Sequence, residues 1–244
     1  MFTTEVPRYL AARMGGMEAP RSRARRMSPE ARRAQIYAAA RELALAEGLH
    51  AISKRTLAAR LGIAPALVGH YAVSMESLVA ETFSAISARE LAEVHALVQG
   101  ADGPRERLAV LLRALLEGGR EDVTAVWADG WSLGRRSEAL AEAVHEQMTA
   151  WETALCEIVT AGVRAGDFRE HDVPAFARGV MGMVDGLNAQ ALVRRRVGAA
   201  REAGERGELV MRVVALELGV DPRAFAVSDR APGPRAPGVA PSRD

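Results

Sequence analysis

Hydrophobic residues recur at intervals of three and four along most of the chain, which is the spacing of one face of a helix. The clearest stripe runs from Leu140 to Gly162, where apolar or small residues follow at steps of four, four, three, four, three and four. No segment alternates apolar and polar residues with the β-branched enrichment of a strand. Alanine, leucine, glutamate and arginine dominate the composition and favour helices. The sequence therefore predicts an all-α protein.

Two short helical patterns meet across a turn in the segment 53–78. Ser53 can cap the first helix with its hydroxyl, Gly62 can end it, and Pro65 suits the first position of the second helix. The outward face of that second helix consists of small residues and one imidazole: Pro65, Ala66, Gly69 and His70. A helix that lies in the major groove of DNA needs such low relief and a few polar tips. The pattern predicts a helix-turn-helix.

The residues around this turn keep a fixed spacing that extends beyond both helices: Thr56, Gly62, Val68, His70, Tyr71, Ser74 and Leu78. In that spacing, and upstream from Ser28 to Gly48, the chain resembles the N-terminal domain of TetR-family transcriptional regulators. Two positions depart from the family pattern: Ala72 stands where an aromatic residue is usual, and Met75 stands where a lysine is usual. The resemblance implies a three-helix DNA-binding domain on a larger all-helical domain that dimerises and binds a small effector.

The rest of the chain reads as a succession of helices. A long helix from Ser74 to Gly100 would place one stripe of residues inward: Leu78, Val79, Phe83, Ile86, Leu91, Val94 and Leu97. Further helices are expected over these ranges: 104–118, 121–134, 135–166, 172–191 and 205–218. By the family resemblance, the last two would form the dimer interface as a four-helix bundle across a twofold axis.

Changes of composition set the predicted domain boundaries. Residues 1–27 lack helical periodicity and end in a cluster of arginines, so we expect a flexible basic arm that either follows DNA phosphates or is a solvated tail. Residues 28–73 form the helix-turn-helix DNA-binding domain, called the head below, and residues 74–227 form the helical effector-binding and dimerisation domain, called the body. The Pro, Gly, Ala and Arg composition of residues 228–244 predicts a disordered tail.

Charge is divided unevenly between the two parts of the chain. Residues 1–80 hold twelve basic and six acidic side chains, whereas residues 81–244 hold twenty basic and twenty-five acidic ones. A basic head is the electrostatic footprint of a polyanion, and an acidic body keeps the rest of the molecule away from the same phosphates. Charge alone indicates only a polyanion; together with the helix-turn-helix and the family resemblance, it makes double-stranded DNA the expected partner.

The residues predicted to contact DNA lie at three helix ends. The first turn of the helix after Ser53 can offer backbone amides and side chains to a phosphate, with Thr56 as the favoured contact. The imidazole of His70 would reach a base edge or a phosphate, and the phenol of Tyr71 a phosphate, unless Tyr71 is simply buried. The full predicted set is Lys54, Arg55, Thr56, Pro65, Ala66, Gly69, His70, Tyr71 and Ser74.

A second group of residues predicts a ligand pocket in the body. Large aromatic and flexible side chains gather in the middle of its sequence, together with polar groups that could orient a ligand. The predicted lining is Trp127, Trp131, Met148, Trp151, Met181, Asp185 and Asn188. Ordinary core packing would explain each of these residues equally well.

The body is also similar to one branch of the TetR family, the choline-responsive repressors of betaine synthesis. The residues that carry this similarity are Trp127, Trp131, Trp151, Gly162, Gly166, Asp185, Gly186 and Leu187. Two tryptophans with a nearby Glu117 could hold a quaternary ammonium group by cation–π attraction. The same residues would suit an apolar ring, so the effector stays unidentified.

Several other classes of protein are disfavoured by the sequence. There is no nucleophile elbow or phosphate-binding loop, and the five histidines lack metal-ligand spacing, so we expect no enzyme, no metal site and no cofactor. A single cysteine, Cys156, excludes an intrachain disulfide and favours the cytoplasm. No apolar run approaches the length of a membrane span, so no membrane partner is expected.

The sequence thus predicts a one-component transcriptional regulator. We expect a homodimeric repressor that binds a pseudo-palindromic operator and is released by a small-molecule effector. The alternative is a constitutive or architectural DNA-binding protein whose helical body only dimerises or docks a protein partner. A body without a cavity would favour the alternative.

Overall fold

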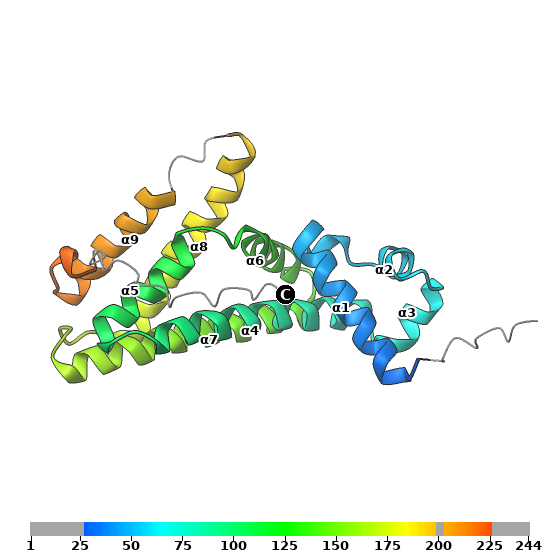
Figure 1. Cartoon of the computed structure of the whole chain (residues 1–244), viewed down its shortest axis with the longest axis horizontal. Coiled ribbons are helices and arrows are strands. Elements are labelled where there is room, and N and C mark those ends of the chain that lie inside the picture. The colour runs from blue at the N-terminus through cyan, green and yellow to red at the C-terminus, as the bar shows by residue number, and fades with distance from the viewer. Residues whose placement is uncertain (1–26, 199–202, 226–244) are drawn as a thin grey trace, which may run out of the picture.

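A computed structural model describes residues 27–198 and 203–225 of the chain. Within these ranges the regular structure is helical and contains no strand, which confirms the predicted all-α fold (Figure 1). The predicted tail, 228–244, and all of the predicted basic arm except Met27 lie outside the described residues.

The head consists of α1 (Pro29–Glu47), the 3-10 turn η1 (Leu49–Ala51), α2 (Lys54–Leu61) and α3 (Pro65–Tyr71). Local hydrogen bonds set these limits. The Ser28 hydroxyl accepts from the Ala31 amide at 3.1 Å to begin α1, and the Ser53 hydroxyl accepts from the Thr56 amide at 3.1 Å to begin α2. Gly62 ends α2 in the left-handed conformation, with a φ of 64°. The predicted helix-turn-helix is confirmed.

The body contains α4 (Met75–Gln99), α5 (Gly103–Leu116), α6 (Glu121–Gly134), α7 (Glu138–Ala165), α8 (Val173–Arg196), α9 (Ala203–Leu218) and η2 (Pro222–Phe225). The long helices α4 and α7 lie side by side along the molecule, and α6 packs against both of them and against α1 of the head (Figure 1). Helices α5, α8 and α9 gather at the end farthest from the head (Figure 1). A buried core there includes Leu108, Leu112, Leu155, Val180 and Val214.

The predicted inner stripe of α4 is correct over its first half and wrong near its end. Phe83 and Ile86 are buried as expected, but Leu97 is 54% exposed. The buried positions between Ile86 and Val94 are polar: Ser87 and the carboxylate Glu90. The cause is tertiary. The inward face of α4 meets α6, where Trp127 donates a hydrogen bond to Glu90. Leu97, by contrast, lies in the last turn of α4 and points to solvent.

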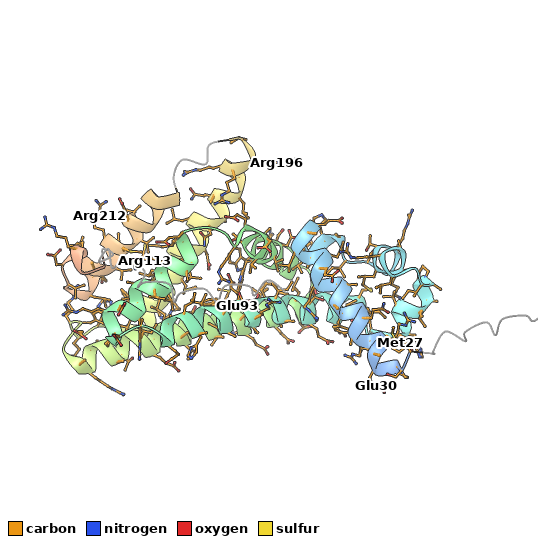
Figure 2. All side chains as sticks on the ribbon, viewed as in Figure 1. Met27, Glu30, Glu93, Arg113, Arg196 and Arg212 are labelled. Carbon is orange, nitrogen blue, oxygen red and sulfur yellow. The ribbon has the colours of Figure 1, made fainter. Side chains whose placement is uncertain are left out.

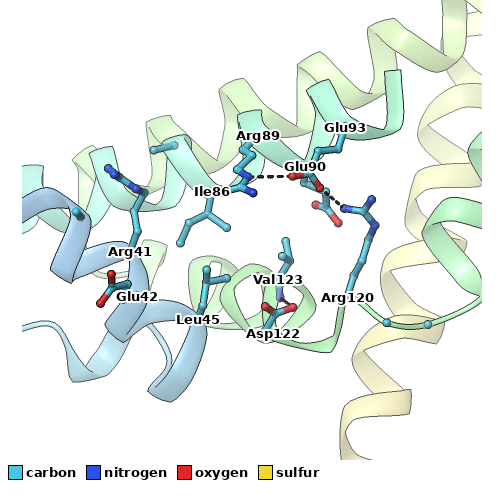
Figure 3. Close-up of a pocket in the computed structure, with 14 residues that line it drawn as sticks. Arg41, Glu42, Leu45, Ile86, Arg89, Glu90, Glu93, Arg120, Asp122 and Val123 are labelled. Carbon is cyan, nitrogen blue, oxygen red and sulfur yellow. Dashed lines mark hydrogen bonds and ion pairs between the residues drawn. The ribbon is translucent and has the colours of Figure 1, made fainter. Parts of the chain in front are cut away.

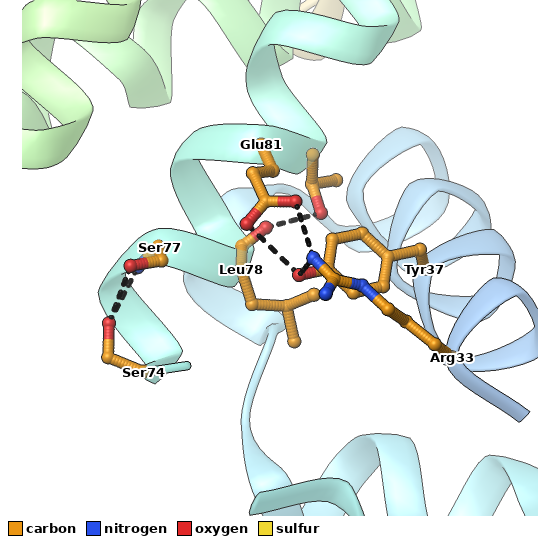
Figure 4. A network of polar contacts seen from close by, with 7 residues as sticks. Arg33, Tyr37, Ser74, Ser77, Leu78 and Glu81 are labelled. Carbon is orange, nitrogen blue, oxygen red and sulfur yellow. Dashed lines mark hydrogen bonds and ion pairs between the residues drawn. The ribbon is translucent and has the colours of Figure 1, made fainter. Parts of the chain in front are cut away.

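Two sets of hydrogen bonds tie the head to the body. On one side, Arg33 and Tyr37 of α1 meet Glu81 of α4, with the Tyr37 hydroxyl donating to the carboxylate at 3.0 Å (Figure 4). On the other side, the backbone amide of Leu49 in η1 donates to the Asp129 carboxylate of α6 at 2.8 Å. Both α4 and α6 belong to the body, so these bonds connect the head to two helices of the body.

Candidate functional site

The outward face of α3 has the low relief that the sequence predicts. Pro65, Ala66 and His70 are exposed, while Gly69 is half-buried. A Cβ atom on Gly69 would lie 3.2 Å from both the Cε and the Nζ atoms of Lys54, so the lysine side chain of α2 crosses α3 at this point. The structure therefore places a cation beside the helix that is predicted to enter the major groove.

The first turn of α2 differs from the expectation in one respect. Lys54 and Arg55 are exposed, but both donors of Thr56 already have partners within the head. The Thr56 hydroxyl donates to the Ala51 carbonyl oxygen at 2.7 Å, and the Thr56 amide donates to the Ser53 hydroxyl. In this conformation Thr56 holds the start of α2 in place, and the side chains free to reach a phosphate are those of Lys54 and Arg55.

The junction between α3 and α4 holds the remaining predicted DNA contacts. The rings of His70 and Tyr71 meet edge to face with centroids 5.1 Å apart, which leaves the imidazole exposed and the phenol half-buried. The Ser74 hydroxyl accepts from the Ser77 amide at 2.9 Å and begins α4 (Figure 4). Ala72, the position where the family pattern predicts an aromatic residue, is 7% exposed and belongs to the buried core of the head.

In the body, the structure brings all seven predicted effector-binding residues around one small cavity, called the inner cavity below. Its volume is about 50 Å³. The predicted residues on its wall are Trp127, Trp131, Met148, Trp151, Met181, Asp185 and Asn188. Sequence reasoning missed the residues that complete the lining: Glu90, Leu115, Arg120, Thr124 and Val184.

Aromatic rings form much of this wall. Trp127 meets Phe83 edge to face at a centroid distance of 5.0 Å, and Trp127 and Trp131 lie 5.8 Å apart with their planes tilted by 36°. Trp151 adds a third indole, which is only 3% exposed. Indole faces are electron-rich and attract cations that approach within about 6 Å.

Two carboxylates lie beside these rings. The Trp127 indole N–H donates to Glu90 Oε2 at 3.2 Å, and Glu90 is 8% exposed. Burial raises the pKa of Glu90 above its ordinary value, although the Trp127 hydrogen bond and the Arg120 charge oppose that rise. Burial, followed by the charge of Glu90, raises the pKa of Asp185 to about 6. Near pH 7 the cavity therefore holds negative charge that is poorly solvated, and a bound cation would stabilise it.

The carboxylate next to the tryptophans differs from the one that the sequence predicts. Glu117 is not part of the lining: its side chain is 62% exposed and pairs with Arg113. Glu90 takes that place, and its sequence does carry a signal. It stands four residues after Ile86 and four before Val94, so it is an acidic residue within an apolar stripe.

A larger space, called the head–body cleft below, separates α1 from α4 and α6 (Figure 3). Its volume is about 880 Å³. Figure 3 shows an apolar floor at Leu45, Ile86 and Val123, with charged side chains around it. The charged lining residues are Arg41, Glu42, Arg89, Glu90, Glu93, Arg120 and Asp122. Glu93, in the middle of the molecule in Figure 2, pairs with Arg89 at 2.9 Å and with Arg120 at 3.2 Å.

Neither a membrane-spanning helix nor a metal-binding group is found in the described part of the chain. Over residues 27–198 and 203–225, no helix is both long and apolar enough to cross a membrane. Over the same ranges, no three His, Cys, Asp or Glu side chains are grouped as a metal site would require.

Comparison with known proteins matches both regions of the chain. The model of the tetR family of bacterial regulatory proteins matches residues 36–82, and the model of the C-terminal domain of BetI-type transcriptional repressors matches residues 104–219. The HTH-type transcriptional regulator BetI of Rhizobium meliloti (strain 1021) is 28% identical over 163 residues, which are 66% of this chain and 77% of that protein.

Solved structures share the fold. A transcriptional regulator from Saccharomonospora viridis in complex with choline is 23% identical, with a TM-score of 0.63 over 77% of this chain and 96% of that one. A TetR transcription regulator from Haloarcula marismortui ATCC 43049 is 18% identical, with a TM-score of 0.66 over 77% of this chain and 98% of that one. The two family models span most of the head and most of the body. The chain therefore belongs to the TetR family of DNA-binding transcriptional regulators, which are not enzymes, and its C-terminal domain is of the BetI repressor type.

Proposed function

We propose that the protein is a homodimeric repressor that a small organic cation releases from a pseudo-palindromic operator. The observation that carries this proposal is the inner cavity, in which Glu90 and Asp185 lie beside three indole rings. A cation seated there gains charge attraction from the carboxylates and cation–π attraction from the rings. The Saccharomonospora viridis regulator was solved with choline, which is a cation of this kind.

The outward surface of α8 and α9 supports the homodimer. One exposed face of α8 carries Gly179, Gly182, Gly186, Gln190 and Val193 at helical spacing, and all of these except Gln190 are small or apolar. A Cβ atom on any of the three glycines at 179, 182 and 186 would meet no neighbouring atom, so there is room for a second helix to approach closely. Leu209, Val213 and Leu216 of α9 are also exposed. A second copy of this face would cover both stripes.

The proposed switch links the inner cavity of the body, 74–227, to the head, 28–73. A dimer can place two recognition helices in successive major grooves only if they are about 34–36 Å apart. Glu90 belongs to α4 and Trp127 to α6, and both of these helices are tied to the head. A cation that moves α4 relative to α6 would change the separation of the two heads and weaken operator binding.

The test is a gel shift of the purified protein on its own upstream intergenic DNA, at stated salt, with and without choline and a panel of small metabolites. The expected result is a specific shift by a dimer, abolished by an organic cation. A specific shift that no compound abolishes would contradict effector control and favour the alternative, a constitutive DNA-binding protein. Absence of a specific shift on the upstream DNA and on a library of random duplexes would contradict the DNA-binding surface.

A further inference from the structure

Arg120 occupies a central place between the cavities of the body. It lines the inner cavity, the head–body cleft and a third cavity of about 20 Å³ beside α8. Its side chain is 26% exposed, and Nη1 lies 3.2 Å from Glu93 Oε2. Figure 3 shows the Arg120 side chain extending from the start of α6 toward Glu93 on α4.

The sizes of these spaces limit how an effector can lie. The inner cavity, at about 50 Å³, is far smaller than the roughly 300–1,000 Å³ of a typical ligand pocket. The head–body cleft, at about 880 Å³, falls within that range. Glu90 and Arg120 line both spaces and form the partition between them. If an effector placed its cationic group against the tryptophans and Glu90, the rest of the effector would therefore lie past Arg120.

Charges of both signs lie along this path. Asp185 lines the inner cavity but not the cleft, whereas Glu90 and the positively charged Arg120 line both spaces at their boundary. A simple cation gains nothing from Arg120, because the two positive charges repel. A ligand with a carboxylate a few bonds from its cationic centre matches both charges, and the guanidinium can bind that carboxylate through two parallel hydrogen bonds.

The ion pair that Arg120 now makes is easily exchanged. Glu93 is also bonded to Arg89, whose Nε lies 2.9 Å from Glu93 Oε1. If Arg120 turned toward a ligand, Glu93 would keep Arg89 as its partner and would not be left as an unpaired charge. The structure thus offers a guanidinium that can change partners at low cost, at the point where a bound effector would emerge.

We propose that Arg120 determines effector specificity, by selecting a small zwitterion with an organic cation at one end and a carboxylate at the other over a simple organic cation. This inference rests on the proposed cation site in the inner cavity. It adds to that site a second contact, on the side of the head–body cleft, and a chemical class for the effector.

The experiment compares three ligands that share a methylated ammonium group: tetramethylammonium, choline and trimethylglycine. Their affinities for the full chain are measured at pH 8 by calorimetric titration. We expect trimethylglycine to bind at least about tenfold more tightly than tetramethylammonium, because its carboxylate gains one hydrogen-bonded ion pair with Arg120. Arg120→Ala should remove that advantage, while tetramethylammonium binds as tightly as before or more tightly.

Arg105→Ala is the matched control, because Arg105 is also an ion-paired arginine of the body but lines neither the inner cavity nor the head–body cleft. It should leave the preference for trimethylglycine unchanged. Arg120→Gln keeps a polar side chain of similar length, so it serves if Arg120→Ala does not fold, and it should also lose the preference. Circular dichroism of each variant checks the fold.

The possible failures are distinguishable. If tetramethylammonium or choline binds the wild-type protein as tightly as trimethylglycine, or if Arg120→Ala weakens all three ligands equally, the role of Arg120 is overturned and the cation site stands. If none of the three ligands binds the wild-type protein, the proposed cation site fails, and the inference fails with it.

Discussion

The head and the body differ in where their polar groups lie. In the head, the hydroxyls of Ser28, Ser53 and Thr56 lie at or near the surface and are satisfied by neighbours in the chain. The body buries a carboxylate, Glu90, and leaves the Ser87 hydroxyl without a hydrogen-bond partner among the described residues. Buried polar groups are costly unless they are fully paired. The surface of the head that recognises DNA needs a fixed shape, whereas a ligand site in the body needs polar groups with which a ligand can form hydrogen bonds or ion pairs.

The packing of the two regions also differs. The core of the head is filled by aliphatic side chains such as Ile36, Leu57 and Val68, each with 0% exposure. The tryptophans of the body instead surround an inner cavity, and its acidic groups have raised pKa values because of burial. The head is therefore closely packed, whereas the body keeps a space beside its tryptophans that the proposed effector could enter.

The largest expected effect is on DNA recognition by the head. Replacing His70 by Ala and Tyr71 by Phe removes two polar tips while keeping the packing of Tyr71, so specific operator affinity should fall on the order of a hundredfold. Gel shifts against operator and random DNA measure this. Lys54→Ala is the comparison, because loss of a phosphate contact should weaken both DNAs alike. Unchanged operator affinity in the double variant would show that α3 is not the recognition helix.

The next prediction tests whether the packing of the body is loose throughout or only around its cavities. Gly162→Ala would drive a Cβ atom into the Phe168 ring at the end of α7, so it should lower the free energy of unfolding by about 1–3 kcal/mol. At Gly134 the nearest atom to a new Cβ is 3.5 Å away, an ordinary contact. Gly134→Ala should therefore stay within about 1 kcal/mol of the wild type. Urea unfolding measures both; equal stabilities would mean that the contrast in packing extends to the whole body.

A third effect tests the connection between the two regions. Asp129→Ala removes the acceptor of the Leu49 amide, so it should lower the free energy of unfolding by about 1–2 kcal/mol. Asp129→Asn retains an oxygen acceptor and should cost less. Thermal unfolding of both variants, followed by circular dichroism, checks the order. If the two variants unfold together with the wild type, the bond between η1 and α6 does not hold the head.

The smallest effect concerns pH. The pKa of Asp185 is raised to about 6, so protonation as the pH falls from 8 to 5 removes a negative charge from the inner cavity. Tetramethylammonium should then bind severalfold more weakly at pH 5, and Asp185→Asn should bind weakly at both pH values. The sign for stability is opposite: the folded protein binds this proton more tightly than the unfolded chain, so this group favours folding at low pH and loses that contribution as the pH rises through 6. Calorimetric titration at each pH measures the binding.

The sequence by itself determined the helices and the motif. Ser53, Gly62 and Pro65 act on the residues immediately around them, so caps and turns could be read without the fold. The spacing of apolar residues likewise predicted Phe83, Leu140 and Leu155 as buried, because a helical period depends only on neighbours in the chain.

Only the tertiary structure decided which polar groups share a site. Glu90 belongs to α4, Asp185 to α8 and Arg120 to the loop before α6, so no spacing along the chain could place them together. The sequence analysis suggested Glu117 as an acid near the tryptophans, but its side chain at the end of α5 is exposed to solvent, and α4 brings Glu90 instead. The occupied hydroxyl of Thr56 and the exposure of Leu97 have the same origin, since both depend on what the folded chain places beside them.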